Sequence, residues 1–110
     1  MDKTQALEMW KYIMQDKEYA YDFAGRKIKK SDYNINNQVG WVVAFIRPLE
    51  LGGTDYEGNT IIMHYTSAEE KGLNYPDFQI MNKTYTVKYD EKEDFYYIEK
   101  TSSEQGGFIW

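Results

Sequence analysis

Residues 40–71, GWVVAFIRPLELGGTDYEGNTIIMHYTSAEEK, contain the signals that decide the fold of this chain. An apolar run at 41–46 is followed by Pro48, which has no N–H to donate to a strand ladder and therefore ends the strand. The pair Gly52-Gly53 lies in the polar segment that follows, and a second apolar run occupies 61–63. The stretch predicts a strand, a long glycine-containing loop and a second strand.

A short helix is predicted directly after the second strand. Thr66, Ser67, Ala68 and Glu69 have the order of a capping box, in which the first and fourth side chains each bond the other residue's backbone N–H. Gly72 is placed to end the helix, because glycine readily adopts the left-handed conformation found just after a helix.

This order of elements resembles the HNH nuclease motif, the ββα-metal unit that cuts nucleic acid. The similarity covers residues 10–80, because the segment DFAGRKI (22–28) is similar to the one that precedes the motif in some small bacterial members. The resemblance implies that Asn59 braces the glycine loop by hydrogen bonds to the backbone. The residues that stand where the HNH pattern expects them are Pro48, Gly52, Gly53, Asn59 and Lys71.

The positions that carry HNH chemistry hold apolar residues in this chain. The Asp-His pair of the family falls on Ala44 and Phe45, and its helix ligand falls on Ala68. A magnesium-type ion needs oxygen or imidazole ligands, and phenylalanine cannot serve as a general base. The resemblance therefore implies a nuclease fold that has lost catalysis and is kept for binding. We expect no enzyme activity, no metal and no cofactor.

Composition limits the class of protein. At 110 residues and 13.1 kDa, with 42 % hydrophobic residues, the chain is expected to form one domain over 1–110. There is no cysteine, so disulfides and thiolate zinc sites are excluded. No apolar run approaches the length of a membrane span, and the N-terminus lacks a signal-peptide stretch. We expect a cytoplasmic protein of a bacterial or phage-infected host cell.

Charge is unevenly distributed along the chain. The net charge is −5, and residues 40–110 contain six Lys/Arg against twelve Asp/Glu. Phosphate backbones are bound by clustered cations, so the acidic balance argues against direct DNA binding. The one cationic segment, Arg26, Lys27, Lys29 and Lys30, could hold phosphate or form a solvated face, and the sequence leaves both open.

The flanking segments complete an α+β fold. An amphipathic helix is predicted at 4–15 with Leu7, Trp10, Ile13 and Met14 on its apolar face, and one or two short strands at 18–33. An antiparallel β-meander is predicted within 77–100 and a mobile tail at 101–110, whose Phe108-Ile109-Trp110 either tucks back or anchors a partner. We expect an N-terminal helix, a degenerate ββα-metal core at 40–72 and this C-terminal sheet.

Three hypotheses for function follow. The first is an inactive HNH-like protein that inhibits a basic nucleic-acid-binding protein, as anti-CRISPR and other anti-defence proteins do. The second is a metal nuclease with relocated ligands, using His64, the only histidine, and loop carboxylates. The third is a regulatory domain that binds nucleic acid through residues 26–30. For the first, the candidate protein-binding residues are Asp90, Glu91, Glu93, Asp94, Tyr89, Tyr96 and Tyr97.

Overall fold

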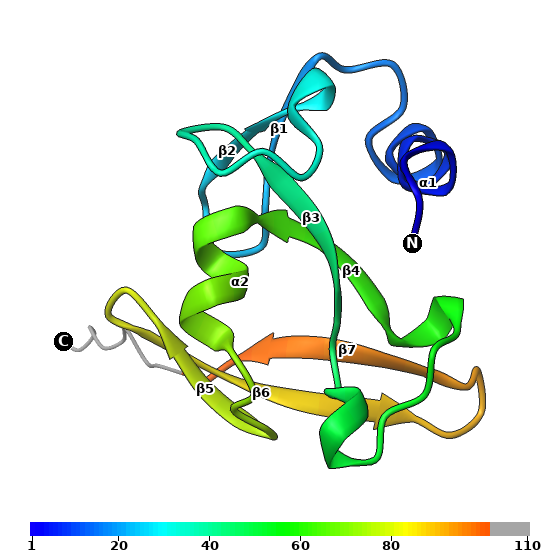
Figure 1. Ribbon diagram of the computed structural model, residues 1–110. Helices are drawn as coiled ribbons and strands as arrows, with labels where there is room; N and C mark the ends of the chain where they lie inside the picture. The colour runs from blue at the N-terminus through cyan, green and yellow to red at the C-terminus, as the bar shows by residue number, and fades with distance from the viewer. Residues whose placement is uncertain (102–110) are drawn as a thin grey trace, which may run out of the picture. The chain divides into compact units, whose positions relative to one another are not determined.

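Helix α1 (Lys3–Met14) begins the computed structural model, which describes residues 1–101 (Figure 1). Asp2 caps the helix, because its Oδ1 accepts a hydrogen bond of 2.8 Å from the backbone N–H of Gln5. Trp10 is fully buried, whereas Ile13 is 50 % exposed. The predicted helix at 4–15 is confirmed, but the prediction that Ile13 lies on its apolar face is wrong.

The chain divides into two units, which are described separately. Among the described residues, unit 1 comprises 1–44 and 61–69, and unit 2 comprises 45–60 and the chain from Glu70 onward. Unit 1 contains α1, the β1–β2 hairpin and most of the β3–β4 pair. The bounds of these elements are β1 Tyr19–Tyr21, β2 Lys27–Lys29, β3 Trp41–Phe45, β4 Thr60–His64 and the 3₁₀ turn Lys30–Asp32.

Two indole rings lie at the centre of unit 1. Trp10 and Trp41 are both fully buried, with ring centroids 4.9 Å apart. Their N–H groups donate to the carbonyl oxygens of Lys17 and Lys30, at 2.9 Å and 3.2 Å, so both polar edges are satisfied. Ile28 packs with them because β1 and β2 pair antiparallel, which turns every second residue inward.

Unit 2 contains the C-terminal meander. Strands β5 (Asp77–Ile80), β6 (Lys83–Asp90) and β7 (Phe95–Lys100) form one antiparallel sheet in the order β5-β6-β7 (Figure 1), so the predicted meander is confirmed. Alternate residues are buried on one face, including Phe78 and Tyr85, whose rings stack at 5.3 Å. Two 3₁₀ turns, Leu49–Leu51 and Glu57–Asn59, lie in the loop between β3 and β4.

Helix α2 (Tyr65–Lys71) follows β4 directly, and Gly72 at φ +53° ends it as predicted. The capping-box prediction is wrong, because the helix begins at Tyr65, one residue before Thr66. His64 provides the cap instead: its Nδ1 accepts a hydrogen bond of 2.9 Å from the N–H of Thr66.

The end of the meander can be followed to Thr101. This residue was expected to begin a mobile tail, yet its N–H donates to the carbonyl oxygen of Thr84 at 2.8 Å. The predictions made for the rest of the tail, including Phe108-Ile109-Trp110, fall on residues 102–110, which lie outside the described residues.

Candidate functional site

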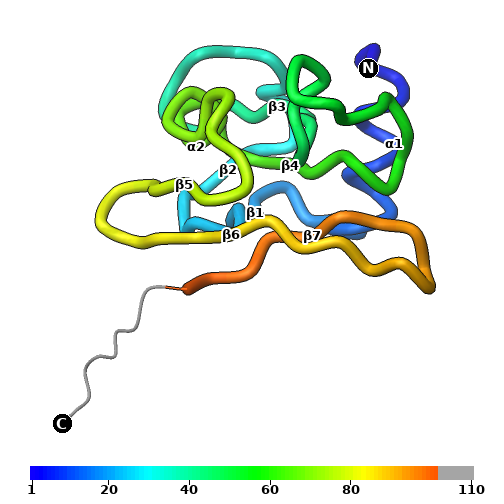
Figure 2. The backbone as a smooth tube through the Cα atoms, turned by 90° about the horizontal axis from the view of Figure 1, so that it is seen from below, coloured from blue at the N-terminus to red at the C-terminus, as the bar shows by residue number. Residues whose placement is uncertain are grey.

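The tip of the β6–β7 hairpin carries the predicted acidic turn. Strands β6 and β7 run side by side to residues 91–94 (Figures 1 and 2). Asp94 adopts φ +58°, a left-handed conformation that Asp tolerates better than most residues, and its N–H donates to the carbonyl oxygen of Asp90 at 2.8 Å. The Asp90 side chain accepts a hydrogen bond of 3.0 Å from the N–H of Glu93. Asp90 and Asp94 therefore help to form the turn.

Asp94 is also held by two tyrosines. Its Oδ1 accepts hydrogen bonds from Tyr89 at 2.6 Å and from Tyr56 at 3.2 Å. The bond to this carboxylate raises the pKa of Tyr89 to about 12, because the hydroxyl proton is shared with a negative acceptor. By contrast, Glu91 and Glu93 are exposed, and their side chains have no hydrogen bond or ion pair within residues 1–101. Two of the four predicted carboxylates are thus free to act on a partner.

The three predicted tyrosines do not share a face of the sheet. Tyr89 is paired directly with Tyr96, and their rings lie 4.8 Å apart. Tyr97 is paired with Lys88, one position along, so it projects from the opposite face. There it meets Phe95 at 5.8 Å, and the two rings are 40 % and 38 % exposed. Phe95 was missed by sequence reasoning, although its position two residues before Tyr97 was a signal that they share a face.

A hollow, called the tyrosine hollow below, lies on the face of the sheet that carries Tyr89 and Tyr96. It has a volume of about 370 Å³ and is formed within unit 2. Its lining residues come from the glycine loop and the hairpin: Gly52, Thr54, Tyr56, Tyr89, Asp94 and Tyr96. Arg47 supports it from outside the lining, because its Nη1 donates to the Tyr96 hydroxyl at 3.4 Å. Tyr56 and Arg47 were not predicted, and no local pattern marks either residue.

The loop that carries Tyr56 is braced by Asn59, as the HNH resemblance implies for this residue. Asn59 is fully buried, and its Oδ1 accepts from the N–H of Arg47 at 2.8 Å. Its Nδ2 donates to the carbonyl oxygens of Arg47 and Thr54, each at 3.0 Å. Gly53 is required here, since a Cβ would collide with the carbonyl oxygen of Arg47. Gly52 adopts φ +94° after the turn that Pro48 begins.

The positions matched to HNH chemistry are structurally ordinary. Ala44 and Phe45 on β3, and Ala68 on α2, are all partly buried and offer no ligand atom. Among residues 1–101, no group of three or more His, Asp or Glu side chains is arranged to hold a metal ion.

His64 uses both of its ring nitrogens within unit 1. It is 5 % exposed, and because its Nδ1 accepts from Thr66, its Nε2 must carry the proton. That N–H donates to the carbonyl oxygen of Gln38 at 2.8 Å. A metal ion could bind His64 only by displacing one of these two hydrogen bonds. In this structure the residue acts as the cap of α2.

Asp22 is the polar centre of unit 1 and was missed by sequence reasoning. Its Oδ1 accepts from the N–H groups of Ala24 and Arg26, which shapes the β1–β2 turn. Its Oδ2 accepts from the N–H of His64 at 3.0 Å and from Ser67 Oγ at 2.7 Å, which joins the end of β4 and α2 to that turn. The order Asp22-x-x-Gly25 was a signal for the turn alone.

Three of the four cations in the segment 26–30 contact other side chains of unit 1. Lys27 and Lys29 both lie over the ring of Tyr19, with Nζ at 4.5 Å and 5.6 Å from its centroid. Arg26 donates to Ser67 Oγ at 3.0 Å, so its guanidinium is engaged inside unit 1. These contacts hold the side chains against the β1–β2 hairpin. Lys30, which follows β2, is partly buried.

Lys71 is an exception to the usual solvation of lysine. It is 2 % exposed, and its Nζ has no hydrogen-bond partner in the described chain. The amine lies over the ring of Phe78, whose centroid is 5.3 Å from Nζ. Burial lowers the pKa of Lys71 to about 8, because the charged form is desolvated.

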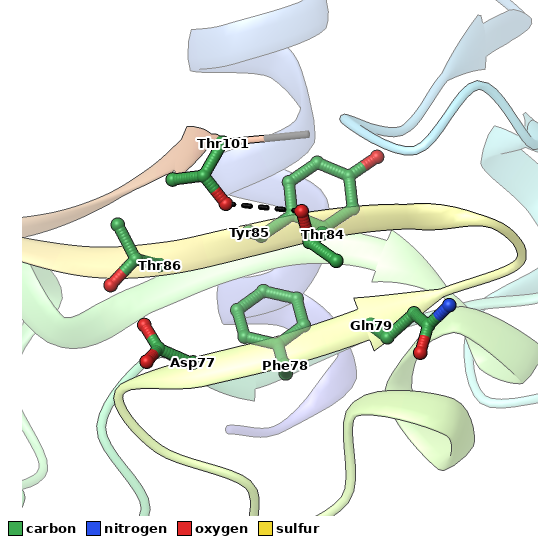
Figure 3. A pocket seen from close by; sticks show the side chains of 7 residues that line it. All are labelled: Asp77, Phe78, Gln79, Thr84, Tyr85, Thr86 and Thr101. Atoms are coloured by element: carbon green, nitrogen blue, oxygen red, sulfur yellow. Dashed lines mark hydrogen bonds between the residues drawn. The ribbon is translucent and has the colours of Figure 1, made fainter. Parts of the chain in front are cut away.

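A second hollow, of about 530 Å³, lies on β5 and β6 (Figure 3). Its lining includes Phe78, Tyr85 and three threonines, and Thr101 donates to Thr84 Oγ1 at 3.2 Å. Its lining has one carboxylate, Asp77, and no cation. It contains one tyrosine, whereas the tyrosine hollow has three tyrosines beside its carboxylate.

Comparison with known protein families, with curated proteins and with solved structures finds no match to this chain. No helix among the described residues is both long and apolar enough to span a membrane.

Proposed function

We propose that this protein is a catalytically inactive HNH-like protein that binds a basic, nucleic-acid-binding protein through its β6–β7 hairpin. An inhibitor of a bacterial defence nuclease, such as an anti-CRISPR protein, is a protein of this kind. One observation carries the proposal: two carboxylates without partners in the described chain, Glu91 and Glu93, lie at the hairpin tip, beside the exposed ring pair Phe95 and Tyr97.

The two parts of this surface have different roles in binding. Charges at the edge of an interface mainly raise the association rate and lose that effect as salt screens them, over about 8 Å at physiological ionic strength. Aromatic rings that become fully desolvated provide most of the binding free energy. Glu91 and Glu93 are therefore assigned to steering, and Phe95 and Tyr97 to contact.

The inactive state is supported by two further observations. Ala44, Phe45 and Ala68 supply neither a general base nor a metal ligand at the positions matched to the HNH pattern. His64, which the relocated-ligand hypothesis requires, has both ring nitrogens in hydrogen bonds that cap α2 and hold Gln38.

The test is capture from a bacterial lysate, first treated with nuclease, on the immobilised full chain. We expect enrichment of a basic nucleic-acid-binding protein, and its loss in the variant Phe95→Ser with Tyr97→Ser. With the purified partner, Glu91→Gln with Glu93→Gln should slow association at low salt and have little effect at high salt.

The matched control is Glu8→Gln with Glu50→Gln, which changes the net charge equally at two exposed sites outside the hairpin. Equal capture by the wild type and the Phe95/Tyr97 variant would contradict the proposal, as would equal slowing by the hairpin and control charge variants.

A further inference from the structure

The tyrosine hollow has the chemistry of a site for a positively charged side chain. Three of its six lining residues are tyrosines, and the faces of aromatic rings carry negative potential that attracts cations. The carboxylate of Asp94 also lines the hollow, beside the three tyrosines. Aromatic faces together with a carboxylate are the groups that bind ammonium and guanidinium ions.

The hydrogen bonds of the hollow fix these groups in place before any ligand binds. Tyr89 and Tyr56 both donate to Asp94 Oδ1, at 2.6 Å and 3.2 Å, and Tyr56 also reaches the carbonyl oxygen of Asp94 at 3.4 Å. Within residues 1–101, Asp94 Oδ2 accepts no hydrogen bond, so one carboxylate oxygen is available to a donor. Groups that are already oriented lose little conformational entropy on binding.

The backbone also confines the hollow. A Cβ on Gly58 would lie 2.6 Å from the Tyr56 ring and 2.7 Å from the carbonyl oxygen of Asp94, so the loop packs closely against the hairpin tip. The volume of about 370 Å³ is within the usual range for small-ligand pockets, about 300–1,000 Å³. It accommodates a side chain rather than a folded element.

The positive charge of Arg47, next to the hollow, would repel a cationic ligand. Arg47 contacts the hydroxyl of Tyr96, but its guanidinium is directed to the carbonyl oxygen of Leu51 at 2.9 Å and lies over Tyr75 at 5.2 Å. A guanidinium of the protein's own chain is thus already stacked on one tyrosine and bonded to another in unit 2. The hollow itself contains Asp94 as its only charged lining residue in the described chain.

We infer that the hollow formed by Tyr56, Tyr89, Tyr96 and Asp94 binds an arginine or lysine side chain of the partner protein. This inference rests on the proposed function, because a basic partner supplies such side chains at the hairpin. The hollow lies on the face opposite Phe95 and Tyr97, so the partner contacts both faces of the hairpin near its tip. The cation lies against the tyrosine rings and donates to Asp94 Oδ2. A guanidinium is the better fit, since it stacks on rings and bonds a carboxylate at the same time.

The test uses N-acetyl-arginine amide as the probe and needs no partner. The full chain, labelled in its tyrosine rings, is titrated by NMR at constant ionic strength into the tens of millimolar. We expect saturable shifts at Tyr56, Tyr89 and Tyr96 with millimolar affinity, because so small a ligand gains little beyond the cost of association. N-acetyl-lysine amide should bind more weakly, and N-acetyl-citrulline amide, the neutral isostere, at least about tenfold more weakly.

Asp94→Asn should weaken arginine-amide binding about tenfold and leave the fold intact, because asparagine tolerates the left-handed conformation and keeps an acceptor for Tyr89. Glu91→Gln is the matched control, since it removes a charge from the same turn but does not line the hollow. Equal affinity for citrulline, unchanged affinity in Asp94→Asn, or the absence of shifts at the three tyrosines would each overturn the inference. Failure of lysate capture with retained arginine binding would instead overturn only the proposed function.

Discussion

Replacing Lys71 with methionine should stabilise the protein near neutral pH. Lys71 is 2 % exposed with an unpartnered amine, and its pKa is lowered from 10.5 to about 8 by burial. One pKa unit corresponds to about 1.4 kcal/mol, so keeping the amine charged in the folded state costs about 3 kcal/mol below pH 8. Methionine has a similar length and no charge, so this cost disappears in the variant.

The sign of the pH dependence follows from proton binding. Between pH 8 and 10.5 the unfolded chain holds the lysine proton and the folded chain releases it, so stability of the wild type rises with pH. The advantage of Lys71→Met should therefore fall from about 3 kcal/mol at pH 7 to about 1.5 kcal/mol at pH 9.5.

The measurement is urea unfolding followed by far-UV circular dichroism at several pH values between 7 and 9.5. A gain of about 3 kcal/mol corresponds to a midpoint increase of about 2 M urea for a small domain. The matched control is Lys88→Met, at an exposed site on β6, which should change stability by less than about 0.5 kcal/mol. A Lys71→Met variant that is no more stable than wild type at pH 7, or whose gain does not vary with pH, would refute this reasoning.

Three further predictions concern the supports of the fold and the absence of catalysis. Asp22→Ala leaves four donors without their acceptor and should lower the free energy of unfolding by about 4 kcal/mol, whereas Asp16→Ala, at an exposed site, should have little effect in the same urea experiment. Gly53→Ala should cost about 1–3 kcal/mol, because its Cβ collides with a backbone carbonyl; an unchanged melting temperature would show that the loop relaxes freely. Incubation with plasmid and single-stranded DNA, with magnesium, manganese or zinc, should give no cutting above a mock preparation, and cutting that His64→Ala abolishes would favour the relocated-ligand nuclease.

The elements of the fold were largely predictable because their signals are local. Runs of β-branched and aromatic residues bounded by turn residues predicted the meander, and its strands bury Phe78 and Tyr85. Gly72 predicted the end of α2, because glycine has no Cβ and therefore adopts a positive φ at little cost. The cap of α2 was predicted at Thr66, two residues after His64, since the cap is a histidine ring, and Ser or Thr capping patterns do not include it.

The candidate site was predictable only in part. The four carboxylates near the hairpin tip were identified, but their separation into two structural and two unpartnered groups depends on backbone geometry in the turn. Tyr97 was assigned to the same surface as Tyr89 and Tyr96, although consecutive residues of a strand point to opposite faces. Strand register decides which of the two joins Tyr89, and it selects Tyr96. A shift of one residue in a strand reverses the face, and tyrosines on both faces give no pattern from which to choose.

The amino-acid sequence by itself determined the α1 helix, the turns at proline and glycine, and the three strands of the meander, because steric limits and side-chain periodicity act within a few residues. Only the tertiary structure decided the contacts between distant segments. Ser67 reaches Asp22 across 45 residues, and Tyr56 reaches Asp94 across 38. Such partners are brought together by burial of the core and closure of long loops, and no spacing along the chain encodes which donor meets which acceptor.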